Sequence, residues 1–349
     1  MDCCRGLMSY SGLTTKIRAM QSHLLTTENY REIVELPSVP AAVAYLRQKP
    51  SYAAILSAAG ETELHRGEIE KMLRQSIYHD FTKIYSFANL KQRKFLDLYF
   101  MRYEVYFLKV CLTNIFDHRN APLDLSAFES FFTKHSRLNF QLLTASSTPE
   151  EFLANLKSSE YYIPLSNIKN VDQPTLFDYE MALDLYYFRK LWKEKDKVIH
   201  EEKSNGLTRI LGSKFDMLNI QWIYRCKRYY HMDHADIYAL LIPVNYHISR
   251  QQTREMVEAA HLDALEAVIS RSYYAKHYEN FTEASLESMY AEILKHILSS
   301  GSRQEPYSVT TVYSYLYHKE HEVDRLIIAL ECVRYQVSPE EAMTHVACR

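Results

Sequence analysis

The sequence predicts an all-α protein, and two observations support that prediction. Only 7 glycines occur among 349 residues, while leucine, alanine, glutamate, lysine and tyrosine fill long stretches, a composition typical of helices with few turns. Similar phrases also recur three times with a period of about 110 residues, which is too long for a common solenoid and indicates small helical domains. We therefore expect similar helical domains over 1–119, 120–235 and 236–349, related by a pseudo-threefold axis.

Two phrases mark each repeat. One is a short helical stretch that ends in an apolar residue, a small polar turn and tyrosine. Its tyrosines are Tyr52 in the first copy, Tyr161 and Tyr162 in the second, and Tyr273 and Tyr274 in the third. The other phrase lies on a long helix and carries an acid in register, namely Glu104, Asp216 and Glu322. Recurrence by duplication favours a structural role for the acids; alternatively, they line a common axis and meet a basic partner.

In the first repeat, apolar spacing predicts an amphipathic helix over 14–25, and Thr26 should cap the helix that follows. Another helix is expected over 61–88, and a long closing helix over 95–116. The closing helix should bury one apolar stripe, formed by Leu98, Met101, Val105, Leu108, Leu112 and Ile115.

The second repeat should follow a connection over 117–122, with a long helix over 176–201, a break at 204–206 and a closing helix over 207–230. The stripe of that closing helix is Leu211, Phe215, Leu218 and Trp222.

The third repeat should follow a connection at 232–235. We expect an exposed loop over 299–306, a last long helix, and a short terminal helix capped by Ser338. The stripe of the last long helix is Leu316, Val323, Leu326, Leu330 and Val333.

Charge and hydropathy limit where the protein acts. A formal net charge of −2 gives no global attraction to nucleic acid or to an anionic membrane, so any such affinity must come from local patches. The apolar runs are far shorter than the roughly 20 residues that span a bilayer, and the first residues lack the apolar core of a secretory signal. We therefore expect a cytosolic chain, or one attached to a membrane through a partner.

Cysteine and histidine patterns do not predict a metal site. The six cysteines form no CxxC pair, so we interpret them as reduced thiols, with Cys111, Cys226 and Cys332 packed within the long helices. Two histidine pairs have spacings that could bind a metal ion, namely His231 with His234 and His318 with His321. No second ligand cluster matches them, so a structural or solvent-facing role is favoured, and neither metal nor cofactor is expected.

Catalytic motifs are absent from the sequence. It contains no phosphate loop, no dinucleotide-binding glycine turn, no nucleophile elbow and no zinc-binding HExxH helix. Cations alternate with aromatic residues near Lys91 and near Arg225, a pattern also found on nucleic-acid surfaces, but the balanced total charge argues against nucleic acid as a partner. Glu322 can pair with Arg325 one helical turn on, as an exposed contact worth roughly a few tenths of a kcal/mol. The sequence thus predicts a non-enzymatic protein.

Three sets of residues resemble one family. They are the opening from Ser9 to Tyr30, the three tyrosine phrases, and the closing stretch from His318 to Leu326. In their order along the whole chain, they are similar to the C subunit of the V-type (A-type) rotary ATPases, a family that includes the d subunit of eukaryotic vacuolar ATPases. The family usually has asparagine where Asp324 stands, and Asn219 keeps an asparagine near the corresponding place in the second repeat.

This resemblance implies a noncatalytic central-stalk protein shaped as a funnel of three helical domains. Its implied partners are the D and F subunits of the central shaft and the membrane proteolipid ring, between which it would transmit torque for proton or sodium transport or for ATP synthesis, on the cytoplasmic side of the membrane. Neither nucleic acid nor a small-molecule substrate is implied. The residues predicted at a partner interface are Arg18, Glu104, Asp216, Asn219, Glu322 and Arg325. The alternative is a soluble helical scaffold unrelated to a motor.

Overall fold

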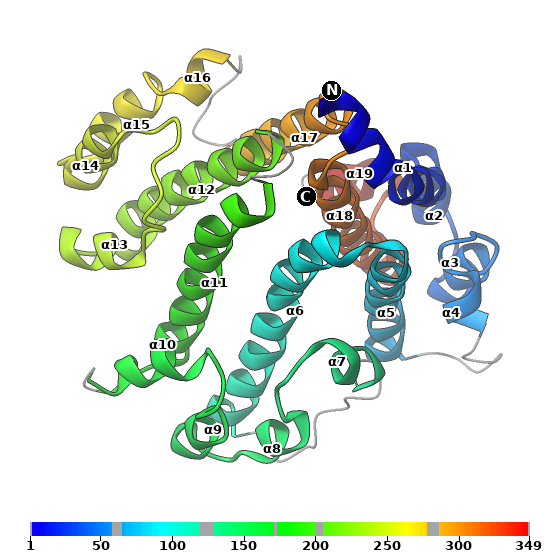
Figure 1. The fold of residues 1–349 in the computed structure, drawn as a ribbon, viewed down its shortest axis with the longest axis horizontal. Coiled ribbons are helices and arrows are strands. Elements are labelled where there is room, and N and C mark those ends of the chain that lie inside the picture. The colour runs from blue at the N-terminus through cyan, green and yellow to red at the C-terminus, as the bar shows by residue number, and fades with distance from the viewer. Residues whose placement is uncertain are drawn as a thin grey trace. The chain divides into compact units, whose positions relative to one another are not determined.

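The computed structural model describes residues 2–57, 65–118, 129–170, 173–199, 205–277 and 286–347. Within these ranges every regular element is a helix and no strand occurs, which confirms the predicted all-α class (Figure 1). The chain forms two compact units: unit 1 comprises 1–90, 202–207 and 287–349, and unit 2 comprises 91–201 and 208–286. The three domains expected over 1–119, 120–235 and 236–349 stay a prediction.

Unit 1 joins the two ends of the chain. Its helices are α1 (Asp2–Gln21), α2 (Thr27–Val34), α3 (Val39–Leu46), α4 (Ala53–Ser57), α5 (Arg66–Phe87), α17 (Leu286–Gln304), α18 (Val309–Arg334) and α19 (Pro339–Ala347). Helix α18 lies against α1, α2, α3, α5 and α19, and its residues are buried on almost every side over its first two turns. A helix near the carboxyl end therefore forms the core around which the amino-terminal helices pack.

Unit 2 contains three long helices and a series of short ones. Its elements are α6 (Leu90–Phe116), α7 (Glu129–His135), α8 (Phe140–Ala145), α9 (Pro149–Asn155), α10 (Tyr162–Ser166), a 3-10 turn (Asn167–Asn170), α11 (Leu176–Ile199), α12 (Gly206–Arg225), a π-helical turn (Cys226–Tyr230), α13 (His234–Leu240), α14 (Arg250–Glu258), α15 (Leu262–Ile269) and α16 (Tyr273–His277). Aromatic rings fill part of its core, where the Phe107 and Phe140 centroids are 4.7 Å apart.

Most of the predicted local features are present. All six stripe residues of α6 and all five of α18 are buried, while Leu218 and Trp222 of α12 are only half-buried. Thr26 caps α2 as predicted: its hydroxyl accepts from the Asn29 amide at 3.3 Å, and the Asn29 side chain accepts from the Thr26 amide at 3.1 Å. Ser338 likewise accepts from the Glu341 amide at 3.4 Å at the start of α19.

One boundary in the second repeat differs from the prediction. The closing helix expected over 207–230 ends as an α-helix at Arg225 and finishes in the π-helical turn. That turn ends at His231, which adopts a left-handed conformation with φ of 48°. Most of the connection expected over 117–122 and part of the break expected at 204–206 lie outside the described residues.

The prediction of an exposed loop over 299–306 is wrong, because α17 continues through Gln304. Serine normally weakens a helix by competing for its backbone, yet here the Ser299 and Ser300 hydroxyls donate to the carbonyls of His296 and Ile297, both at 3.1 Å. The preceding turns bury Ile293, Leu294, Ile297 and Leu298. Tertiary packing therefore outweighs the local preference for a turn.

Candidate functional site: three buried acid–tyrosine pairs

The acid of each repeat binds a tyrosine of the recurring tyrosine phrase. Tyr52 donates to Glu322 Oε1 at 2.5 Å, Tyr161 to Glu104 Oε2 at 2.6 Å, and Tyr274 to Asp216 Oδ2 at 2.9 Å. All six side chains are buried. The acids lie on the long helices α18, α6 and α12, and the tyrosines lie at or just before the short helices α4, α10 and α16. The two recurring phrases are thus two halves of one structural contact.

The pairs are offset by one repeat. Glu104 of the first repeat binds Tyr161 of the second, Asp216 of the second binds Tyr274 of the third, and Glu322 of the third returns to Tyr52 of the first. Each predicted boundary, at 119 and at 235, falls between an acid and its tyrosine. Glu104 and Asp216 thus each bind the tyrosine phrase that follows their own helix, whereas Glu322 binds that of the amino-terminal segment.

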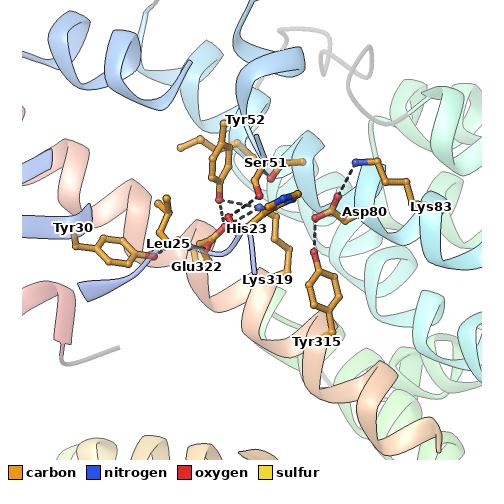
Figure 2. A network of polar contacts seen from close by, with 12 residues as sticks. His23, Leu25, Tyr30, Ser51, Tyr52, Asp80, Lys83, Tyr315, Lys319 and Glu322 are labelled. Atoms are coloured by element: carbon orange, nitrogen blue, oxygen red, sulfur yellow. Dashed lines mark hydrogen bonds and ion pairs between the residues drawn. The ribbon is translucent and has the colours of Figure 1, made fainter. Parts of the chain in front are cut away.

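The Glu322 cluster contains a buried ion pair (Figure 2). Lys319, which is 0% exposed, donates from Nζ to Glu322 Oε1 and to the Tyr52 hydroxyl oxygen, both at 2.9 Å. The Leu25 amide donates to Glu322 Oε2 at 2.5 Å, and the Tyr30 hydroxyl donates to the Glu322 carbonyl at 3.2 Å. Each carboxylate oxygen thus has a donor, which a buried charge requires to be tolerated.

Burial also sets the protonation of the tyrosine in this cluster. Burial and the charge of Glu322 raise the pKa of the Tyr52 hydroxyl well above its ordinary value of 10.0. Tyr52 therefore stays protonated and donates to the acid while accepting from Lys319. Nearby, the Ser51 hydroxyl donates to the His23 carbonyl at 3.0 Å, joining the turn before α2 to the turn before α4 (Figure 2).

A second acid and tyrosine lie beside this cluster. Tyr315 of α18 donates to Asp80 Oδ2 of α5 at 2.7 Å, and Lys83 Nζ lies 3.4 Å from Asp80 Oδ1 (Figure 2). Asp80 and Tyr315 are both buried. Polar contacts thus fix α18 to the amino-terminal helices of unit 1 at two neighbouring points.

Among the described residues, no cation forms an ion pair with Glu104. Glu104 accepts hydrogen bonds from the hydroxyls of Tyr161 and Ser136, and Met101 stands three residues before it, where the third repeat has lysine. Burial raises the pKa of Glu104 above its ordinary value of 4.5, and the bonds from Ser136 and Tyr161 oppose that shift. This carboxyl is therefore easier to protonate than a solvated one.

The Asp216 cluster uses backbone donors. The amides of Tyr246, His247 and Ile248 donate to Asp216 at 3.1, 2.6 and 3.0 Å. Burial raises the pKa of Asp216, opposed by these three bonds and by the Tyr274 hydroxyl. One turn earlier on α12, a Cβ on Gly212 would lie 2.4 Å from the Tyr246 ring, so the loop can approach the helix closely only because this residue is glycine.

The three clusters share a further feature. In each, the acid also accepts a hydrogen bond from the loop that leads into a capped helix. The Leu25 amide, the Ser136 hydroxyl and the amides of 246–248 are the donors. Side chains of Thr26, Asn139 and Ser249 cap the helices that follow. One carboxylate therefore fixes two segments, a loop and a tyrosine phrase, to one long helix.

The other residues predicted at a partner interface lie in different surroundings. Arg18 is exposed on α1. Asn219 is buried. Its side-chain amide donates to the Ile242 carbonyl and accepts from the Ile242 amide, both at 2.9 Å. Arg325 lies over the Tyr30 ring at 4.4 Å and donates to the Val346 carbonyl at 3.0 Å. The expected pair between Glu322 and Arg325 is wrong, because the ion-pair partner of Glu322 is Lys319.

Sequence reasoning missed Lys319. Its spacing of three residues from Glu322 is a standard helical ion-pair spacing and was a usable signal, but lysine is so seldom buried that a surface role was the natural interpretation. The backbone donors of 246–248 had no signal in the sequence, because any residue can supply an amide.

His318 is half-buried, and Cys111, Cys226 and Cys332 are buried. Within the described residues, no group of three histidine, cysteine, aspartate or glutamate side chains could hold a metal ion. Burial, with His321 and Lys295, lowers the pKa of His318 to about 4, so this ring is neutral. Cys111, Cys226 and Cys332 are buried free thiols, and burial raises the pKa of Cys111 to about 12. The helices described also include none that is long and apolar enough to cross a membrane.

Comparison with known proteins identifies the family. The C subunit of the A-type ATP synthase from Pyrococcus horikoshii is 25% identical over 345 residues, covering 95% of this chain and 88% of the relative. The protein of the same name from Pyrococcus abyssi is 23% identical over 95% of the chain and 88% of the relative, and that of Methanococcoides burtonii is 19% identical over 92% and 89%. The family model described as ATP synthase (C/AC39) subunit matches residues 13–345. The chain therefore belongs to the ATP synthase (C/AC39) subunit family.

Proposed function

We propose that this chain is the central-stalk coupler of a V-type (A-type) rotary ATPase or ATP synthase. It would receive the foot of the D–F shaft, sit on the proteolipid ring at the cytoplasmic side of the membrane, and turn with both. Its family is a noncatalytic part of ATP synthase, so hydrolysis or synthesis of ATP belongs to other subunits. The ring it turns would move protons or sodium ions.

The observation that carries this proposal is the family match over residues 13–345. Relatives named as C subunits of A-type ATP synthases also align over more than nine-tenths of the chain. A likeness of this extent leaves no separate region of the chain for an unrelated activity, and it disfavours the alternative of a scaffold unrelated to a motor.

The acid–tyrosine pairs suit a part that bears torque. A coupler must resist shear between its helices, and packed interiors transmit strain with little compression. In each copy, one buried carboxylate ties a loop and a tyrosine phrase to a long helix. Few glycines, 7 in the whole chain, add to the stiffness of the backbone.

Of the six residues predicted at a partner interface, we propose Arg18 as a direct contact, because its side chain is exposed on α1. The carboxylates of Glu104, Asp216 and Glu322 bond inside their own units, and we propose that they position the elements that present the contact surfaces. Asn219 and Arg325 would act in the same way, through their bonds to Ile242 and Val346.

The test is co-elution of the purified chain with the D–F shaft of its host, at low and at high salt, followed by binding to membranes that carry the proteolipid ring. We expect a complex with both partners, and weaker shaft binding at high salt, because contacts across mismatched symmetries should be partly polar. Arg18→Glu should weaken binding to one partner, while Arg31→Glu, also exposed in unit 1, serves as the matched control. Failure of the folded chain to bind either partner would overturn the proposal.

A further inference from the structure

Large apolar side chains are exposed together at one corner of unit 1. Met8 of α1 is 84% exposed, Leu90 at the start of α6 is 79% exposed, and Phe87 at the end of α5 is 58% exposed. We call these three residues the α1–α5 corner. Single exposed apolar residues are ordinary, whereas several at one place mark an interaction surface.

Two contacts place these residues at the same corner. The Asn89 side chain lies 3.3 Å from the Ser9 hydroxyl, and these are the chain neighbours of Leu90 and Met8. Further along α1, Lys16 Nζ lies 5.3 Å from the centroid of the Phe87 ring. The chain over 87–89 therefore lies beside α1 within unit 1.

The charge of these two segments is of one sign. The sequence has no aspartate or glutamate over 3–27 or over 81–96, although the chain contains 43 acidic residues. Lys16 and Arg18 lie on α1, whereas Lys83, one turn before Phe87, is paired with Asp80. Lys16 is half-buried beside the Phe87 ring, and Arg18 is exposed. Residues 3–27 and 81–96 thus carry cations and no carboxylate, and the neighbouring acid Asp80 is paired with Lys83.

We propose that the α1–α5 corner inserts into the headgroup region of an anionic lipid surface. Apolar side chains favour the boundary between headgroups and acyl chains, and nearby lysine and arginine favour anionic phosphate. A lipid layer can adapt to separate exposed apolar side chains, whereas a protein partner would need a surface of matching shape. This contact goes beyond the proposed function, which involves protein partners alone.

The test is sedimentation of the full chain with vesicles of phosphatidylglycerol and phosphatidylcholine, compared with vesicles of phosphatidylcholine alone. We expect binding to the anionic vesicles only, weakened by salt. The double variant Phe87→Ser, Leu90→Glu should reduce the affinity at least about tenfold, because it removes apolar area and adds an acid. Ile163→Ser is the matched control, because Ile163 is 69% exposed and lies in unit 2, and it should leave binding unchanged.

Several results would overturn the proposal. One is a wild-type chain that does not bind anionic vesicles. Another is a double variant that binds them as tightly as the wild type does, and a third is an equal loss of vesicle affinity in the double variant and in Ile163→Ser. A double variant that binds vesicles normally but no longer binds the detergent-solubilised ring would assign the corner to a protein contact instead. The D–F co-elution is scored separately, so failure of the lipid contact and failure of the motor assignment are distinguishable. Circular dichroism of each variant verifies that it is folded.

Discussion

The Glu322 cluster of unit 1 and the Glu104 cluster of unit 2 hold corresponding carboxylates in different ways. Both acids accept from a buried tyrosine and from the loop before a capped helix. Glu322 also has the buried Lys319, whereas the described donors to Glu104 are two hydroxyls, and the pKa of Glu104 is raised. The same contact can therefore be built with or without a fixed charge pair, and the two versions should respond differently to mutation and to pH.

The largest effect is expected for Lys319→Met, which leaves Glu322 buried without its cation. Removing one partner of a buried ion pair costs about 3–5 kcal/mol, so the free energy of unfolding in urea should fall by that amount. Hydrogen exchange at the Leu25 amide, which donates to Glu322, should accelerate. The double variant Lys319→Met, Glu322→Gln should recover part of the loss. If Lys319→Met were as stable as the double variant, the loss would not come from a buried Glu322 charge without its cation.

A smaller loss is expected for Asp216→Asn. The asparagine keeps one acceptor oxygen, but its amide nitrogen faces a backbone amide of 246–248, leaving a buried donor unsatisfied, which costs about 1–3 kcal/mol. Urea unfolding measures the loss. Asp184→Asn, at a half-exposed position of α11, is the control and should change stability much less. Equal stability of Asp216→Asn and the wild type would show that the backbone donors contribute little.

For Glu104→Gln we expect a loss of at most about 1 kcal/mol near neutral pH, because no buried cation is left unpaired and the two hydroxyls can reorient. The pH dependence is the sharper measurement. Because burial raises the pKa of Glu104 in the folded state, its contribution to stability is present below the ordinary value of 4.5 and is lost as pH rises through the raised value.

The glutamine variant lacks this titration. Its stability relative to the wild type should therefore improve as pH rises from about 4 to about 8, as measured by urea unfolding across that range. A difference between the two that is constant with pH would mean that Glu104 titrates as a solvated carboxyl does.

The smallest effect is expected for Arg31→Ala, which removes an exposed ion pair with Glu28 at the same spacing of three residues as Lys319 and Glu322. Exposed helical pairs of this kind contribute roughly 0.2–0.5 kcal/mol, so the midpoint of urea unfolding should hardly move. This variant supplies the solvated baseline for the buried pair. A loss as large as that of Lys319→Met would remove burial as the explanation of the difference.

Local patterns in the sequence predicted local structure well. The cap at Thr26 and the buried stripe of α6 depend on neighbours within one or two turns, and both are present. The acids were also found, because they recur in register. Their partners could not be predicted, since Tyr52 and Glu322 are 270 positions apart and no periodicity links such distant residues. The helix through 299–304 was missed because burial of Ile297 and Leu298, rather than local preference, maintains it.

The hydrogen bond between Tyr52 and Glu322 joins the two ends of the chain. It therefore also determines when the amino-terminal segment can finish folding during synthesis. The ribosome must add 270 positions after Tyr52 before Glu322 exists, which at typical rates takes roughly a quarter of a minute to a minute. Throughout that time the apolar faces of α2, α3 and α5 lack the helix on which they pack. The nascent chain should therefore be a substrate for chaperones that bind exposed apolar segments, and a message truncated before α18 should yield a product that is degraded.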